Sequence, residues 1–235
     1  MNLGVLWLKI IDLTLELYDG LVTNNDLPAI GIKDEPLEQK GKSDSLPKGC
    51  RSKLISFSDH SGTHVDVPSH YFENGESVEN INLENMFGDA LILDVSMLKA
   101  THEPVTKALL EEAERRQGVY VEKNDIVLIR TWGKPWGEEG FFEAQALDDS
   151  VAQWFIEKQI HIVGLDLPNA DLNQDSESGI HQKLLNHDIY IVENLVNLEK
   201  LPKHSRFLFF GIPLKLKNAT ASPIRALSIL DSQLI

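Results

Sequence analysis

The segment from His60 to His70 constrains this chain most, because it carries several metal-binding side chain types within eleven residues. These are His60, His64, Asp66 and His70, all at even positions. Residues two apart in an extended chain point to the same side, so the four would share one face while Val65 and Val67 point away. Such a polar face needs an occupant, and histidine with carboxylate is ligand chemistry for a divalent metal.

Two geometries are open for His60 and His64. A helical i, i+4 pair is disfavoured by Gly62, by the β-branched neighbours and by Pro68. In a straight strand, four residues span roughly 13 Å, too far for one metal held by each imidazole at about 2.1 Å. Either Gly62 bends the chain, since glycine adopts positive φ without a Cβ clash, or two metals are bound. The alternative to a metal site is that these four polar side chains simply form the solvent-exposed face of a strand.

The excess of acidic residues limits the kinds of molecule that this chain is expected to bind. The chain has 22 Lys and Arg against 36 Asp and Glu, a formal charge of -14, which argues against nucleic acid and anionic membrane and favours a small-molecule substrate. No apolar stretch reaches the roughly 18 residues of a membrane-spanning helix. The single Cys50 excludes an internal disulfide and indicates a reducing, cytoplasmic location. Because no base is identifiable near Cys50, a loop thiol is favoured over a nucleophile.

Strand and helix patterns alternate, which predicts a mixed α/β class in a single domain spanning residues 1–235. The stretch from Thr23 to Lys53 is rich in proline, asparagine and charged residues, which predicts a long loop or flap. Asp149 or Ser150 is predicted to cap a helix that ends at Lys158. The other predicted elements are strands at Leu3–Leu17, Leu91–Val95, Asp125–Arg130, Ile162–Leu165, Ile189–Val192 and Phe207–Phe210, and a helix from Pro104 to Gln117 closed by Gly118.

The segment His-Ser-Gly-Thr-His-Val-Asp-Val-Pro-Ser-His resembles the H-x-G-T-H-x-D-x-P-x-H signature of the cyclase family, which includes bacterial kynurenine formamidases and isatin hydrolases. The resemblance extends to the strand with Asp12-Leu13-Thr14 and to the turn Gly164-Leu165-Asp166-Leu167-Pro168. A histidine twelve residues before a glutamate, as in the family, is found at His181 and Glu193. The similarity therefore covers most of the chain.

The resemblance implies a swivelling β/β/α fold with a mixed sheet, assembled as a homodimer or homotetramer. It implies that His60, His64 and Asp66 bind a divalent metal, zinc or manganese, and that His181 and Glu193 complete a second site in members with two ions. It further implies that His70 is the general acid/base. Taken by themselves, His181 is a surface helix residue, with Ser176 or Ser178 as a helix cap, and Glu193 is an exposed strand end.

The expected reaction is hydrolysis of a C–N bond in a small amide, formamide or lactam by a metal-activated water, with His70 moving the proton. Rival interpretations are a metal-dependent cyclase or dehydratase and a non-catalytic metal-binding protein. The stretch from Thr23 to Lys53 lacks the Pro-rich Trp-Pro segment of formamidases, so the substrate stays open. Trp132 and Trp136 are expected either to stack on an aromatic ligand or to cover a core or a subunit interface. His187 is a candidate for a contact with the metal ligands or with the substrate, whereas solvent or core roles are expected for His102, His161 and His204.

Overall fold

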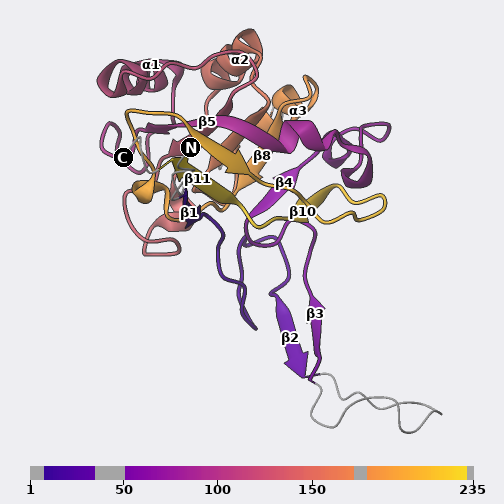
Figure 1. The fold of residues 1–235 in the computed structure, drawn as a ribbon. Helices are drawn as coiled ribbons and strands as arrows, with labels where there is room; N and C mark the ends of the chain where they lie inside the picture. Colours follow the sequence, from indigo (N-terminus) through magenta and orange to yellow (C-terminus); the bar gives the residue numbers. More distant parts are fainter. Residues whose placement is uncertain (1–7, 35–50, 172–178, 232–235) are drawn as a thin grey trace, which may run out of the picture.

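Four parallel strands form the centre of a nine-stranded mixed sheet in the computed structural model, which describes residues 8–34, 51–171 and 179–231 (Figure 1). They are β5 (Phe87–Asp94), β6 (Ile126–Arg130), β7 (Ile162–Leu165) and β8 (Tyr190–Glu193), adjacent in that order. The residues of β6, β7 and β8 and the second half of β5 are almost all buried, as expected for strands covered on both faces. The predicted strands at these positions are confirmed.

Three helices cover one face of the parallel strands: α1 (Lys107–Gln117), α2 (Asp149–Lys158) and α3 (Ile180–Leu185) (Figure 1). Their buried side chains pack on strand residues such as Leu91, Val127 and Val163. Helix α1 begins three residues after Pro104, because the side chain of Thr106 accepts a hydrogen bond from the Leu109 amide. Gly118 ends the helix in the left-handed conformation, as predicted.

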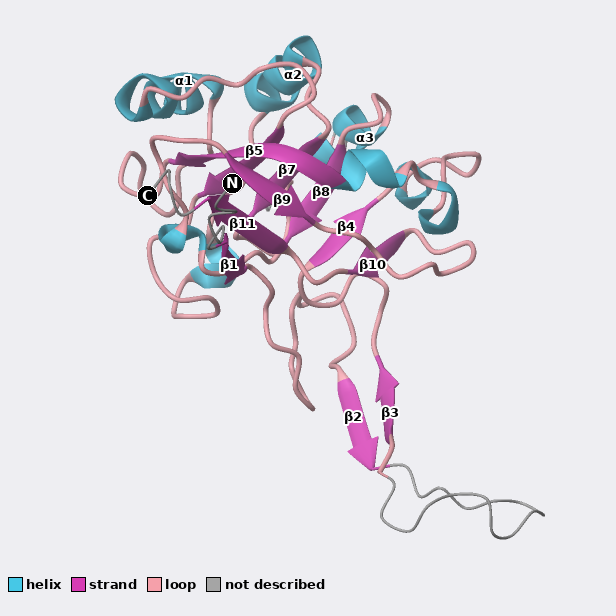
Figure 2. Ribbon diagram, viewed as in Figure 1, coloured by secondary structure: helices cyan, strands magenta, loops and turns pink. Residues whose placement is uncertain are grey.

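Antiparallel strands extend the sheet at both edges, in the order β1-β11-β9-β5-β6-β7-β8-β4-β10. The curled sheet encloses a second core on the face opposite the helices, and Val65 and Val67 belong to it, as their spacing predicted. The flanking strands are β1 (Leu8–Asp12), β11 (Leu227–Asp231) and β9 (Phe207–Phe210) on one side, and β4 (His64–Asp66) and β10 (Ala221–Pro223) on the other (Figure 2).

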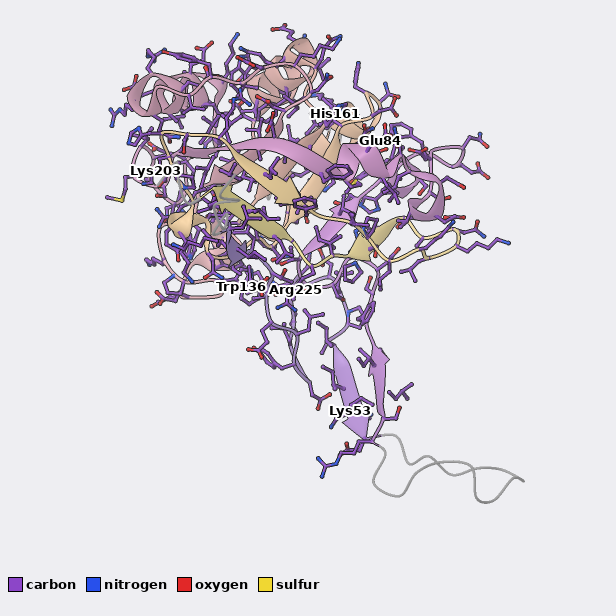
Figure 3. All side chains as sticks on the ribbon, in the orientation of Figure 1. Lys53, Glu84, Trp136, His161, Lys203 and Arg225 are labelled. Carbon is purple, nitrogen blue, oxygen red and sulfur yellow. The ribbon has the colours of Figure 1, made fainter. Side chains whose placement is uncertain are left out.

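A hairpin of β2 (Gly31–Asp34) and β3 (Lys53–Ser56) projects away from the body (Figures 1 and 2). Lys53, near its far end in Figure 3, pairs with Asp34 at 2.8 Å. Within the stretch from Thr23 to Lys53, predicted as a long loop or flap, the residues of β2 pair with β3, a hairpin that the sequence patterns did not predict. The intervening residues 35–50, with Cys50, lie outside the described part of the chain.

Other boundaries differ from the sequence patterns by a few residues. Asp148, and not Asp149 or Ser150, caps α2, since its carboxylate accepts from the Ser150 and Val151 amides. The predicted N-terminal strand is seen at Leu8–Asp12, whereas residues 1–7, Ser176 and Ser178 lie outside the described residues. Among the described residues no helix is long and apolar enough to cross a membrane. The same residues also form five 3-10 helices: Pro68–His70, Val78–Asn80, Leu83–Met86, Phe141–Glu143 and Leu198–Lys200.

Candidate metal centre

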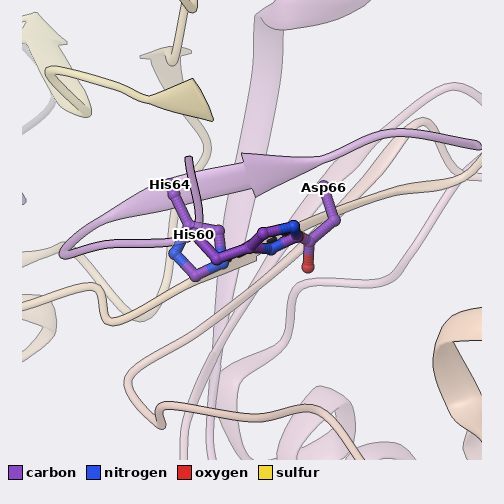
Figure 4. A group of neighbouring side chains, drawn as sticks. All are labelled: His60, His64 and Asp66. Atoms are coloured by element: carbon purple, nitrogen blue, oxygen red, sulfur yellow. Dashed lines mark ion pairs between the residues drawn. The ribbon is translucent and has the colours of Figure 1, made fainter. Parts of the chain in front are cut away.

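Gly62 bends the chain between His60 and His64. Its φ is +70°, in the left-handed region, and a Cβ there would lie 2.4 Å from a methyl carbon of Leu17. The bend turns the two imidazoles toward each other, with ring centroids 5.3 Å apart (Figure 4). The chain is therefore neither helical nor straight between His60 and His64; it bends at Gly62, as one of the two alternatives from the spacing required.

Asp66 lies at the centre of the cluster and is 1% exposed. One carboxylate oxygen, Oδ1, is 2.8 Å from His60 Nδ1 and 3.3 Å from His64 Nε2 (Figure 4). The other oxygen, Oδ2, is 3.3 Å from Nε2 of His181. Three ring nitrogens therefore meet one carboxylate.

Helix α3 and strand β8 bring His181 and Glu193 to the same carboxylate, the position that the family resemblance implied for them. His181 Nε2 lies 3.1 Å from Glu193 Oε1, and His64 Nε2 lies 3.6 Å from Glu193 Oε2. The register explains the second contact, because His64 on β4 is paired directly with Glu193 on β8. Both residues are buried, so His181 is no surface residue and Glu193 is no exposed strand end.

The ligand-type atoms form two overlapping groups that share Asp66. In each group the ligand atoms all lie within 4.8 Å of one another. The first group is His60, His64 and Asp66, and the second is Asp66, His181 and Glu193. Two such groups with a shared carboxylate could hold one ion or two.

The carboxylate of Asp66 tests whether these residues fit a cation. Within the described chain neither of its oxygens has a hydrogen-bond partner, although three ring nitrogens approach within 3.3 Å. The three nitrogen–oxygen contacts are thus short, but their angles are not those of hydrogen bonds. Buried polar atoms are normally hydrogen-bonded, and a buried carboxylate without such bonds requires a positive charge. The residues therefore fit a divalent metal.

Each histidine of the cluster has its second ring nitrogen engaged elsewhere. Nδ1 of His64 faces the carbonyl oxygen of Gly62 at 2.9 Å, and Nδ1 of His181 faces Oδ2 of Asp171 at 2.9 Å. These acceptors place the proton on Nδ1 and leave the lone pair of Nε2 directed to the cluster. Partners of this kind orient metal-binding imidazoles and select their tautomer.

His60 presents the opposite nitrogen to the cluster. Its Nε2 lies 3.0 Å from Oγ1 of Thr220, and that hydroxyl in turn donates to Oδ2 of Asp59 at 3.0 Å. Because the hydroxyl proton is committed to Asp59, Thr220 accepts from His60, and Nδ1 keeps its lone pair toward Asp66. Neither Asp171, Asp59 nor Thr220 was predicted from the sequence, since no local pattern links them to the histidines.

The pKa values show how strongly the carboxylates attract positive charge. Burial opposes protonation of His64, but the charge and hydrogen-bonding proximity of Asp66 and the charge of Glu193 outweigh it and raise the His64 pKa to about 9. Burial raises the pKa of Asp66, yet the surrounding imidazoles, His64 first, hold it well below its usual range. The cluster thus holds cations, whether protons or metal ions.

His70 lies beside the cluster but outside both groups of ligand atoms. It sits on the 3-10 helix after β4, with its ring centroid 4.1 Å from that of His60 and 5.8 Å from that of His181. Burial, with the neighbouring imidazoles, lowers the His70 pKa to about 4, so that the ring is neutral at pH 7. Tyr71 is next to it and stacks on His181 at 5.7 Å.

These side chains line a pocket of about 160 Å³. The sequence patterns did not single out five of its residues, which come from the loop after β1, the turn after β4 and the loop after β7: Asn24, Leu27, Tyr71, Asn169 and Asp171. Asn169 and Asp171 follow the turn ending at Pro168, which was a usable signal. His187 is exposed and lines a different depression with His161, so it is no contact of this pocket.

Trp132 and Trp136 lie in a second cavity of about 420 Å³, which shares no lining residue with the metal pocket. Trp132 is buried and Trp136 partly buried, and both contact Phe141 in a small separate core. Asp166 anchors their loop, because its carboxylate accepts from Thr131 and from the Trp132 amide. The arrangement agrees with the core-covering alternative for both tryptophans.

The mixed sheet and the buried histidine–carboxylate cluster are those of an α/β protein with a metal centre. The family model Cyclase, described as "Putative cyclase", matches residues 11–172, and the chain belongs to this family. This confirms the resemblance of the histidine segment to the family signature.

Named relatives agree with this assignment. The chain is similar to a kynurenine formamidase of Bacillus cereus, with 32% identity over 73% of this chain and 77% of that protein. It is also similar to a kynurenine formamidase of Bacillus anthracis, with 30% identity over 93% of this chain and 96% of that protein. Among solved structures, isatin hydrolase A from Labrenzia aggregata bound to benzyl benzoate has a TM-score of 0.80 at 24% identity, over 96% of this chain and 94% of that one.

Proposed function

We propose that this protein is a metal-dependent hydrolase that cleaves the C–N bond of a small amide, formamide or lactam. One observation carries the proposal: Asp66 is buried among three imidazoles, yet neither oxygen has a hydrogen-bond partner in the described chain. The kynurenine formamidases among its relatives support the reaction class. Isatin hydrolase A supports the fold that presents the cluster.

The residues proposed to hold the metal are His60 through Nδ1, His64 and His181 through Nε2, and the carboxylates of Asp66 and Glu193. When bound, a divalent ion supplies Lewis acidity, which polarises a carbonyl group and lowers the pKa of water. Imidazole with carboxylate suits zinc and also manganese, and we propose one or two ions of these metals. Glu193 is itself held in place, because Oε1 accepts from the Ala170 amide at 2.7 Å.

His70 is proposed as the general acid/base. Its ring borders the metal pocket, belongs to neither group of ligand atoms and is neutral at pH 7. A neutral imidazole accepts a proton from water and returns it to the leaving nitrogen. A protein that used the metal only as a structural clip would not need this residue beside the cluster, which favours the enzyme over the non-catalytic alternative.

The test combines metal analysis with a substrate panel. Purified protein should contain zinc or manganese and hydrolyse at least one of the formyl-anilides, lactams or isatin. Asp66→Asn should lose most of the metal and the activity, whereas Asp125→Asn should keep both, because the equally buried Asp125 pairs with Arg206 away from the cluster. A fully metallated, active Asp66→Asn variant would refute the assignment.

The description of the family as putative cyclases suggests a second candidate reaction, cyclisation or dehydration with the same metal. Hydrolysis incorporates one oxygen atom of water into the acid product, whereas dehydration or ring closure does not. Reaction in ¹⁸O-labelled water, followed by mass spectrometry of the product, separates the two.

The expected homodimer or homotetramer, cytoplasmic location and small-molecule substrate stay proposals. An apolar patch on the outer face of the sheet supports the oligomer: Ile10, Ile229 and Leu208 lie side by side across β1, β11 and β9, and Ile10 is 61% exposed. The acidic composition argues against nucleic acid and membrane as partners, and the single cysteine supports a reducing compartment. Light scattering of the purified protein measures the oligomer.

A further inference from the structure

Asn194, which directly follows Glu193, is a buried polar residue that the proposed chemistry does not use. It has 0% exposure and a φ of +56°, a left-handed conformation that asparagine tolerates better than most residues. Its Nδ2 has no hydrogen-bond partner in the described chain. Burying such a group without a partner is unfavourable, and an apolar side chain would avoid this cost. The residue therefore calls for a specific explanation.

Three segments of the chain meet at Asn194. Its backbone oxygen accepts from Oγ1 of Thr63 at 2.6 Å, and its amide donates to the Leu167 carbonyl at 2.9 Å. Its side-chain Oδ1 accepts from Nε1 of Trp136 at 3.0 Å. Trp136, labelled in Figure 3, belongs to the loop after β6 and lines the larger cavity.

The contact with Thr63 bears directly on the metal centre. Thr63 lies between Gly62 and His64, and Asn194 lies next to Glu193, so one hydrogen bond joins the residues adjacent to two of the proposed ligands. His64 and Glu193 are paired across β4 and β8, with Nε2 and Oε2 3.6 Å apart. The Thr63–Asn194 hydrogen bond therefore ties the segment that carries Glu193 to the bend that carries His64.

We propose that Asn194 is a positioning residue, which holds Glu193 and His64 at the separation that the metal centre requires, with the Trp136 indole fixing its side chain. The proposal rests on the proposed function, because it presumes that the two residues bind metal. Residues that hold metal ligands in place typically change metal affinity by about 10- to 100-fold when mutated.

Asn194→Gly tests the side chain alone, because glycine keeps the left-handed backbone at little cost. It should weaken Zn²⁺ binding by roughly 10- to 100-fold, measured by competition with a chromophoric chelator. The matched control is Asn197→Gly. Asn197 has the same left-handed conformation, at φ +62°, but its side chain donates to the Asp12 carbonyl and contacts no proposed ligand. This control should bind Zn²⁺ as the wild type does.

Thr63 and Trp136 provide variants that do not alter Asn194 itself. Thr63→Val should weaken Zn²⁺ binding, and Thr63→Ser, which restores the hydroxyl, should recover it. Trp136→Phe removes the Nε1 donor and should weaken binding in the same direction. Thermal unfolding of each metal-free variant separates a loss of affinity from a loss of fold.

The outcomes distinguish this inference from the proposed function. If the wild type binds no divalent metal, both are overturned. If the wild type binds Zn²⁺ and Asn194→Gly binds it equally well, or if Asn197→Gly loses as much affinity, only the positioning role is overturned. A loss confined to Asn194→Gly, Thr63→Val and Trp136→Phe, with recovery in Thr63→Ser, supports it.

Discussion

At the scale of single residues, the metal centre is organised around one carboxylate. Asp66 contacts the ring nitrogens of His60, His64 and His181, and each ring has an acceptor for its other nitrogen. In each of these three rings one nitrogen faces the cluster and the other faces a partner outside it. His70 is the imidazole of the pocket that lies outside both groups of ligand atoms, so its substitution separates catalysis from metal binding.

His70→Ala should keep the metal content near that of the wild type while lowering turnover by about 100- to 10,000-fold, the contribution typical of a general acid/base. The physical reason is that the ring lies beside the cluster without supplying a ligand atom. Parallel metal analysis and steady-state kinetics make the measurement.

His102→Ala is the control for His70→Ala, since His102 is exposed and does not line the metal pocket, so this variant should keep both metal and turnover. Loss of metal in His70→Ala would make His70 a ligand. Unchanged turnover would assign the proton transfer to another group.

At the scale of elements, short polar signals set where helices begin. Helix α2 starts after Asp148, whose carboxylate accepts from two amides of the first turn. Its neighbour Asp149 is instead exposed and pairs with Lys183. Two adjacent aspartates thus have different roles, and only one of them satisfies helix amides.

Asp148→Ala should lower the free energy of unfolding by about 1 kcal/mol, the usual cost of removing an N-cap. Asp149→Ala should cost less, because exposed ion pairs contribute roughly 0–1 kcal/mol. Urea denaturation of both variants makes the comparison. Equal effects, or a larger effect for Asp149→Ala, would contradict the assignment of the cap.

At the scale of the whole molecule, the proposed metal ligands join parts of the fold that are far apart in sequence. They come from the bend before β4, from β4, from α3 and from β8. A ligand that binds only the folded state stabilises it, so the metal should hold this edge of the sheet to the helix layer.

Removing the metal with a chelator should therefore lower the melting temperature. A metal present at 1,000 times its Kd stabilises by about 4.1 kcal/mol, which for a protein of this size corresponds to roughly 8–16 °C. Differential scanning calorimetry before and after chelation, and after adding zinc back, makes the measurement. The Asp66→Asn variant should not respond to the chelator, and a response equal to that of the wild type would contradict the site.

Much of the fold could be predicted from local patterns. The strands at residues 126–130, 162–165 and 207–210 consist almost entirely of apolar residues and glycine. The helix that ends at Gln117 is followed by Gly118, whose left-handed conformation favours glycine. The helical cap at Asp148 and the strands β2 and β3 were missed. A cap depends on side-chain direction among neighbouring polar residues, and a short exposed hairpin has no apolar alternation.

The sequence by itself determined that His60, His64 and Asp66 come together. Their even spacing and the ability of Gly62 to adopt a positive φ are local properties of one segment. Only the tertiary structure decided how the distant residues reach the centre and which residues, such as Thr220, support its histidines. His181 is brought there by α3, and Thr220 by the pairing of β10 with β4. Sheet order and helix packing join residues more than 100 positions apart, and no pattern of neighbouring residues encodes such contacts.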